Sequence, residues 1–246
     1  MKAEAVRKDQ DFLESDLQSR NRSCIFTDLG LADYADVLIL QGSTRDEMIK
    51  DPALPDRVFF VQHPSVYTLG KRGGRENLTV SESFLESKGI PIVQTGRGGN
   101  ITYHGPGQAV LYPVIHLERA RIGVADFVAG LEEIMKRTAS DFGVPADRNE
   151  RNHGLWVGNK KIGSVGISIQ KGVSIHGLAL NLNPDLTPFS WINPCGLADM
   201  SMTSIEKEVE GVQPSVSFSM DRVKSLFIQH FSDIFDYAIA EEEHEN

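Results

Sequence analysis

The spacing of apolar side chains predicts three amphipathic helices along the chain. Apolar residues recur at helical intervals from Leu31 to Met48 and over residues 124–142, and a third apolar stripe lies near the C-terminal end. The last two stripes are formed by Phe127, Leu131, Ile134 and Met135, and by Val223, Leu226, Phe227, Phe231, Ile234 and Phe235. A helix with one apolar face buries that face against a sheet or another helix.

Short apolar runs between these helices predict strands. The runs are RVFFVQ and SVYTLG, which Pro64 separates, PIVQTG at 91–96, AVLYPVIHL at 109–117 and SIHGLALNLN at 174–183. Pro64 interrupts the first pair because proline donates no hydrogen bond to a neighbouring strand. Gly158 and Asn159 lie between two further β-like runs and predict a tight hairpin turn, so that Lys160 and Lys161 begin its second strand.

Strands and hairpins outnumber the helices, and no long linker, repeat or change of composition divides the chain. We therefore expect one α/β (or α+β) domain over residues 24–240, with a mixed, largely antiparallel sheet flanked by helices. Residues 1–23 contain five basic and five acidic side chains and predict a solvated polar extension. Residues 241–246 predict an acidic tail.

The composition narrows the class of protein. Of the 246 residues, 40% are hydrophobic and 24% are charged, as in ordinary soluble domains. The net charge of −9 argues against non-specific nucleic-acid binding, which needs a basic surface. The chain has no apolar signal-peptide core, and no apolar run approaches the roughly 18 residues of a membrane helix. With only two cysteines, Cys24 and Cys195, we expect a soluble cytoplasmic protein with free thiols.

The segment TGRGGNITYHGPGQAVLYP, residues 95–113, holds five glycines within twelve positions. Such a cluster lets the backbone turn tightly or lets a ligand approach it closely. A plain glycine-rich turn is the alternative, but the embedded Arg97, Tyr103, His104 and Gln108 favour a ligand-binding loop. The segment is no nucleotide P-loop, because the Lys-Ser/Thr pair is missing, and a strand rather than a helix follows it.

Cys195, in the segment WINPCGLADM, has two readings. It is either a buried, inert thiol or a nucleophile whose pKa a neighbouring cation lowers. Lys161 on the predicted hairpin strand is a candidate for that cation, although sequence alone leaves open whether the two side chains meet.

The remaining polar motifs are less specific. The histidines lack the spacing of a metal site, so we expect no metal. His176 is predicted to be a hydrogen-bonded strand residue that lines a pocket rather than a ligand. The basic run KRGGR at 71–75 is either a solvated loop or a landing patch for an acidic partner.

Four blocks, taken in order, resemble the lipoyl(octanoyl) transferases, which are octanoyl-carrier-protein:protein N-octanoyltransferases. They are RGGNITYHGPGQAVLYPVIHL (97–117), NKKIGSVGI (159–167), SIHGLALNLNPDL (174–186) and INPCGL (192–197), and VQHPSVYTLGKRGG (61–74) also fits. The resemblance covers roughly residues 25–240. It implies the fold of biotin and lipoate protein ligases and a monomeric cytoplasmic enzyme that needs no cofactor.

The resemblance also implies roles for residues at matching positions. Cys195 would be the acyl-thioester nucleophile and Lys161 its catalytic partner. The acyl pocket would be lined by Arg97, Gly98, Gly99, Asn100, Ile101, Thr102, Tyr103, His104, Ser164, Val165, Gly166, Gly177, Leu178 and Ala179. The donor would be octanoyl-acyl carrier protein. The acceptors would be lysines on the lipoyl domains of 2-oxoacid dehydrogenase E2 subunits and on the glycine cleavage H protein.

Three other functions remain open at this point. An ATP-dependent lipoate–protein ligase would share the fold but need an adenylate site and no essential thiol. A non-catalytic lipoyl-domain binding protein would form no acyl-enzyme. A cysteine-dependent thioesterase would release free octanoate instead of modifying a protein.

Overall fold

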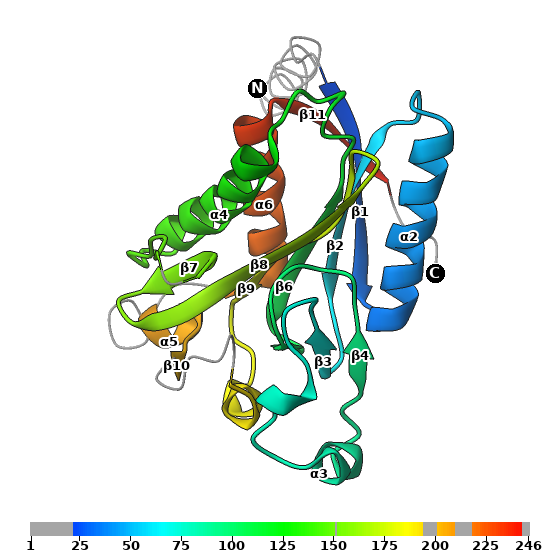
Figure 1. Ribbon diagram of the computed structural model, residues 1–246. Helices are drawn as coiled ribbons and strands as arrows, with labels where there is room; N and C mark the ends of the chain where they lie inside the picture. Colours follow the sequence, from blue (N-terminus) through cyan, green and yellow to red (C-terminus); the bar gives the residue numbers. More distant parts are fainter. Residues whose placement is uncertain (1–21, 151, 194–200, 210–217, 243–246) are drawn as a thin grey trace.

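The computed structural model describes residues 22–150, 152–193, 201–209 and 218–242, and its centre is a large twisted sheet (Figure 1). The strand order is β10-β8-β9-β6-β2-β1-β11, and β7 pairs with β8 beside this path. The strands are β1 (Arg22–Leu31), β2 (Asp56–Gln62), β6 (Gln108–Val114), β7 (Gly154–Val157), β8 (Lys160–Gln170), β9 (Val173–Asn181), β10 (Ser201–Met202) and β11 (Tyr237–Glu242). A second sheet, in the order β4-β3-β5, contains β3 (Val66–Leu69), β4 (Ile92–Gln94) and β5 (Thr102–His104).

The pairing confirms a mixed sheet whose centre is antiparallel. β2 pairs with β6, β6 with β9 and β9 with β8 in antiparallel register, and β8 continues into the β7 hairpin. The parallel pairs of this sheet lie toward its edges, where β1 joins β2 and β11, and β10 joins β8. The hairpin turn at Gly158 has the positive φ of +58° that glycine readily adopts, as the sequence predicts.

Helices cover both faces of the large sheet (Figure 1). The helices are α2 (Tyr34–Lys50), α3 (Glu82–Ser87), α4 (Val124–Asp141), α5 (Ile205–Val209) and α6 (Met220–Phe235), with short 3₁₀ turns at Arg75–Asn77 and Thr187–Trp191. α4 and α6 pack on one face and α2 on the other. Among the described residues, no helix is both long enough and apolar enough to cross a bilayer.

The predicted apolar stripes form the core between these layers. Phe127, Leu131, Ile134 and Met135 of α4 are fully buried. In α6, Val223, Phe227, Phe231 and Phe235 are buried, whereas Leu226 and Ile234 are only half-buried at the margin. On the opposite face, α2 packs against β2, β6 and β9 through Tyr34, Val37 and Met48. The three predicted helices are therefore confirmed.

Side-chain caps set where two of these helices begin. Asp33 accepts a hydrogen bond from the Ala35 N–H at 2.7 Å, and Ser219 accepts one from the Arg222 N–H at 3.2 Å. Each bond satisfies a backbone donor that has no partner within the first turn of a helix. α6 ends at Asp236, whose left-handed φ of +57° turns the chain into β11.

The strands β1 and β11 were not among those expected from the sequence. They pair with each other in parallel, from Arg22 with Tyr237 to Thr27 with Glu242. The described sheet therefore starts two residues before the expected domain and ends two residues after it. A strand whose partner comes from the other end of the chain has no local turn signal that reveals it.

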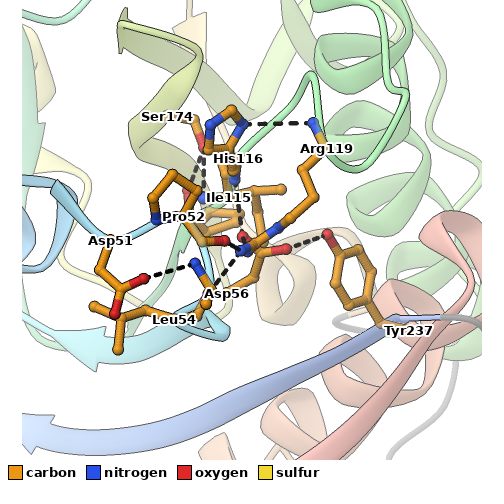
Figure 2. Close-up of polar contacts among 11 residues, drawn as sticks. Asp51, Pro52, Leu54, Asp56, Ile115, His116, Arg119, Ser174 and Tyr237 are labelled. Carbon is orange, nitrogen blue, oxygen red and sulfur yellow. Dashed lines mark hydrogen bonds and ion pairs between the residues drawn. The ribbon is translucent and has the colours of Figure 1, made fainter. Parts of the chain in front are cut away.

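A polar cluster around Asp56 anchors this edge of the sheet (Figure 2). The Asp56 carboxylate, at the start of β2, accepts hydrogen bonds from the His116 N–H (2.8 Å), Arg119 Nη2 (2.6 Å) and the Tyr237 hydroxyl (2.7 Å). Arg119 also donates to the backbone carbonyls of Pro52 and Leu54. The cluster thus joins β2, β11, the loop after α2 and the turn after β6.

Candidate active site

One cavity lies where the glycine-rich segment meets the β8–β9 hairpin. It holds about 680 Å³ of space unoccupied by protein atoms, counting its open mouth. The glycine-rich segment contributes Arg97, Gly99, Asn100, Ile101, Thr102 and His104. The hairpin contributes Lys161, Ser164, Val165, Gly166, His176, Gly177, Leu178 and Ala179. The remaining lining residues are Tyr34, Val110, Tyr112, Asn152, Phe189 and Met202.

The cavity brings together most of the residues proposed from the sequence. Gly98 and Tyr103 are the described exceptions, because neither lines it. The Gly98 N–H donates to the Ile167 carbonyl at 2.8 Å and so ties the loop to β8. The Tyr103 side chain is buried in the core of the small sheet, with its hydroxyl 2.8 Å from the Ser65 hydroxyl. Both residues therefore fix neighbouring segments of the chain instead of contributing to the cavity lining.

Cys195 lies outside the described residues. The chain on either side of its segment is described. The Asn193 N–H donates to the Asn77 carbonyl at 2.7 Å, and Met202 pairs with Lys161 in the β10–β8 ladder. Phe189 and Met202, which flank the segment, both line the cavity.

Close backbone contacts hold the glycine-rich loop in place. Arg97 is 8% exposed, and its guanidinium donates to the Thr68 carbonyl at 2.6 Å and to the Thr68 hydroxyl at 2.8 Å. Gly99 has a φ of +84°, which favours glycine. A Cβ atom on Gly70 would lie 2.3 Å from the Gly99 carbonyl oxygen, so the approach of the 71–75 loop requires glycine there.

Lys161 reaches the cavity from a buried position. The residue is 4% exposed, and its ammonium lies 5.4 Å from the centre of the Trp156 ring, within the range of a cation–π contact. A side chain on Gly154 would meet the Lys161 stem at 2.7 Å, so glycine leaves the room that the lysine occupies. A buried ammonium beside a ligand cavity is suited to hold an anion or to transfer a proton.

A hydrogen-bonded chain links the glycine-rich segment to the strand beside Lys161. His104 Nδ1 lies 2.7 Å from the Gln108 side-chain oxygen, so this nitrogen donates. The Gln108 amide donates to Asn181, and the Asn181 amide donates to the Thr203 carbonyl, each at 2.9 Å. Burial lowers the pKa of His104 to about 3. His104 is therefore a neutral, fixed wall of the cavity near pH 7.

His176 matches its prediction in all but the hydrogen bonding of its side chain. It lines the cavity from β9, as expected, but neither ring nitrogen has a hydrogen-bond partner among the described residues. The nearby polar groups are already engaged: the Tyr112 hydroxyl bonds His63 at 2.9 Å, and Arg97 bonds Thr68. The predicted hydrogen bonding is therefore confirmed for the backbone, whose N–H donates to the Gln41 side-chain oxygen at 2.8 Å, but not for the imidazole.

A second hollow adjoins the cavity. The two share Gly99, Asn100 and Asn152 as lining residues. Arg72 of the basic 71–75 loop lines the second hollow, whereas Arg75 does not line it and pairs with Glu82 at 3.2 Å. The docking of an acidic partner on this loop stays a prediction.

Several lining residues were not predicted from the sequence. Tyr34 begins α2, Tyr112 lies in β6, and Phe189 and Met202 come from the C-terminal half of the chain. Of these four, Tyr112 alone lies within a block that suggested a site, as does the lining residue Val110, and no local signal marks the other three. Across the described ranges, no group of three histidine, cysteine, aspartate or glutamate residues could hold a metal ion.

Comparison with known proteins identifies the family of this chain. A model of the lipoyl protein ligase A/B catalytic domain matches residues 33–232. The chain belongs to this family. It is 46% identical over 210 residues to an octanoyltransferase of Desulfotalea psychrophila, covering 85% of this chain and 92% of that protein. It is 42% identical over 205 residues to a mitochondrial octanoyltransferase of Arabidopsis thaliana, covering 83% and 87%.

A solved structure of a lipoate protein ligase has the same fold. A bipartite lipoate protein ligase of Thermoplasma acidophilum, studied with its E2 lipoyl domain, superposes with a TM-score of 0.66. The match covers 92% of this chain and 89% of that chain at 18% identity. At this identity the likeness confirms the lipoate-ligase fold that the sequence blocks imply.

Proposed function

We propose that the cavity binds an octanoyl group and that this lipoyl protein ligase A/B family member transfers it to a protein in lipoylation. The observation that carries this function is the identity of up to 46% to octanoyltransferases over 85% of the chain. The cavity fits an acyl chain because its walls include Ile101, Val110, Val165, Leu178 and Ala179, with Lys161 among the polar lining residues. Each buried CH₂ contributes about 0.8 kcal/mol to binding.

The proposed chemistry passes through an acyl thioester on Cys195. The Cys195 thiolate attacks the thioester carbonyl of the donor, the bond to the carrier sulfur breaks, and the Lys161 ammonium gives its proton to the departing thiolate, which leaves as a thiol. The amine of the acceptor lysine then attacks the acyl-enzyme, and the neutral Lys161 takes the amine proton. An amide forms, and the thiolate–ammonium pair is restored. Exchange between thioesters is nearly thermoneutral, and amide formation is favourable, so the route consumes no ATP.

Backbone N–H groups of the glycine-rich segments are proposed to stabilise the oxyanion of each tetrahedral intermediate. A donor of this kind contributes about 10²–10³ in rate in other enzymes. The Gly98 N–H is already bonded to Ile167, so the donors come from other residues of these segments.

The proposed acceptors are lipoyl domains in general, which is consistent with the lipoyl-domain partner of the Thermoplasma ligase. More specifically, we propose that octanoyl-acyl carrier protein is the acyl donor. The acyl acceptors are proposed to be E2 subunits and the glycine cleavage H protein. We also propose that the enzyme is a monomer. Its molar mass, measured by light scattering coupled to gel filtration, tests this proposal.

Intact-protein mass spectrometry tests the thioester route. After incubation with octanoyl-acyl carrier protein, the wild-type chain should gain one octanoyl group that hydroxylamine removes. The Cys195→Ala variant should gain none, and the matched Cys24→Ala variant should behave as wild type, because Cys24 is buried and burial raises its pKa. Addition of a lipoyl domain should then move the group to the domain.

The alternative functions give different results in this experiment and in three further assays, of pyrophosphate exchange into ATP, of free octanoate and of lipoyl-domain binding. Exchange of pyrophosphate into ATP with octanoate, without an acyl-enzyme, indicates a ligase. Free octanoate without acylation of the lipoyl domain indicates a thioesterase. Binding of the lipoyl domain without any acyl transfer indicates a non-catalytic partner. Each of these results contradicts the proposed transferase.

A further inference from the structure

Lys161 lies beside an irregularity in the pairing of β7 with β8. Leu155 pairs with Gly163 and Trp156 pairs with Lys161, so Ile162 is an extra residue of β8 with no opposite residue on β7. A β-bulge of this kind changes the direction of nearby side chains, and such bulges are over-represented next to active sites. The position of Lys161 therefore depends on how β7 is held against β8.

Two residues of β7 enclose the Lys161 side chain. The ammonium lies 5.4 Å from the centre of the Trp156 ring, and a Cβ atom on Gly154 would lie 2.7 Å from Lys161 Cε. The same Cβ atom would lie 2.3 Å from the Gly163 carbonyl oxygen, and the Gly154 φ of +129° favours glycine. The Gly154 backbone is thus packed against the lysine stem, and a shift of Gly154 changes the space that the stem occupies.

A carboxylate of α4 holds the Gly154 backbone in this position. α4 lies beside β7 at this end of the sheet (Figure 1). Glu132 Oε1 accepts the Gly154 N–H at 2.8 Å in a buried hydrogen bond, and it lies 3.1 Å from His153 Nδ1. Removal of this oxygen leaves the Gly154 N–H without its partner, which favours movement of the start of β7.

Glu132 differs from its neighbour Glu133 by this bond. Glu132 is 5% exposed and is the only charged residue among those that α4, described over its whole length, buries. A buried carboxylate is costly unless it is paired and hydrogen-bonded. Arg148 lies 3.3 Å from Glu132 but only 2.8 Å from Glu133, which is more exposed. The ion pair with Arg148 is therefore shared by both carboxylates, whereas the contact with β7 belongs to Glu132.

We infer that Glu132 is a positioning residue, which holds the Gly154 backbone against the Lys161 stem and so keeps the ammonium where it exchanges protons with the substrates. Glu132 lines the adjoining second hollow and not the acyl cavity, so it acts through Lys161. This inference rests on the proposed function, which gives Lys161 its role. It adds that a residue of the helix layer controls the geometry of the proton donor.

Steady-state kinetics of octanoyl transfer compare two substitutions of Glu132. Alanine removes the acceptor oxygen, so kcat should fall about 10- to 100-fold, as expected when a catalytic group is misplaced by about 1 Å, with little change in KM for the octanoyl donor. Glutamine keeps an oxygen for the Gly154 N–H and should retain most of kcat. The matched control is Glu133→Ala, which should behave as wild type. Equal losses in Glu132→Ala and Glu132→Gln, or in Glu132→Ala and Glu133→Ala, would overturn the inference.

A double variant tests whether Glu132 acts through Lys161. In the Lys161→Met background, Glu132→Ala should not lower the residual transfer rate further, because the group that Glu132 positions is already absent. The same fold-loss in this background as in the wild type would overturn the inference. If Glu132→Ala does not fold, Glu132→Asp replaces it in each measurement, since the shorter side chain draws the carboxylate back from Gly154.

Amine labelling separates this inference from the proposed function, because it needs no turnover. Reductive methylation followed by peptide mass spectrometry measures the labelling rate of buried Lys161 relative to exposed Lys160 in the same chain. This ratio should rise about five- to tenfold in Glu132→Ala, as expected for one lost hydrogen bond, and stay near the wild-type value in Glu132→Gln. If the wild type transfers no octanoyl group, the proposed function fails, while this rise still supports positioning by Glu132. An unchanged ratio in Glu132→Ala rejects it.

Discussion

The polar cluster at Asp56 and the cavity wall at His176 are both buried in the same sheet, on β2 and β9, yet their hydrogen bonding differs. At Asp56, both carboxylate oxygens accept hydrogen bonds, and Arg119 and Tyr237 direct their donors to them (Figure 2). At His176, two ring nitrogens lie buried without a partner among the residues that the structure describes.

This difference separates two uses of buried polarity. A cluster of paired polar groups stabilises the arrangement of β-strands that brings the groups together. If one member is removed, the remaining members are buried without hydrogen-bond partners. An unpaired group in a cavity lowers stability unless a ligand completes it. The contrast predicts that substitutions near Asp56 change stability more than activity, and that substitutions in the cavity do the reverse.

The substitution Lys161→Met is the strongest test of the prediction that cavity residues affect activity more than stability. Methionine keeps the apolar stem but removes the ammonium, so kcat should fall by about 10²–10⁴ through loss of the proton donor and acceptor. The melting temperature should fall less than in any Asp56 variant. The matched control is Lys160→Met, because the neighbouring lysine is exposed and pairs with Glu208 on the surface. Equal kcat values for the two variants would contradict the role of Lys161.

The substitution Asp56→Ala tests the prediction that residues of the Asp56 cluster affect stability more than activity. It leaves the Tyr237 hydroxyl, the His116 N–H and one Arg119 bond unpaired, so the free energy of unfolding should fall by about 3 kcal/mol. Octanoyl transfer by the folded protein at low temperature should persist. Urea titration measures the loss. Arg57→Ala removes an adjacent surface ion pair with Glu242 and should cost less than about 1 kcal/mol.

Acid sensitivity is a further consequence of the neutral histidines around the cavity. Burial lowers the pKa of His63 to about 4 and those of His104 and His176 to about 3, against about 6.5 in the unfolded chain. The unfolded chain therefore binds more protons below pH 6.5. Stability should be lost as pH falls from about 6.5, by up to about 1.4 kcal/mol per pH unit for each histidine.

The variant His176→Asn measures how much one of these histidines contributes to the pH dependence of stability. Urea unfolding at pH 7, 6 and 5 should give a pH slope that is smaller than in wild type by about one proton. An unchanged slope would show that His176 is not buried as a neutral group in the folded protein.

The smallest expected effect comes from a substitution that tests whether every buried polar group without a partner marks a ligand site. The Thr138 hydroxyl in α4 is also buried without a partner in the described chain, but it does not line the cavity. Thr138→Val should therefore raise the free energy of unfolding by about 1 kcal/mol and leave activity unchanged. Thr203→Val, which removes a paired hydroxyl next to β10, should lower it instead. A loss of activity in Thr138→Val would contradict the distinction between an unpaired polar group inside the cavity and one outside it.

Much of the fold could be predicted from local patterns. The stripe in α4 identified the buried face, and Gly158 with Asn159 identified the β7–β8 turn, because helix periodicity and turn conformation depend on neighbouring residues. The edge strands β1 and β11 could not be predicted in this way, since each is completed by a strand from the opposite end of the chain.

The site divides in the same manner. The sequence by itself determined the glycine-rich loop, the hairpin that carries Lys161 and the family, because residue types in order preserve these features. Only the tertiary structure decided that Tyr34, Tyr112 and Phe189 share one cavity wall, and that Gln41 and Gly177 hold His176 in a left-handed conformation. Such placement depends on which elements pack together and on where their donors find partners, and neither is written in the spacing of residues along the chain.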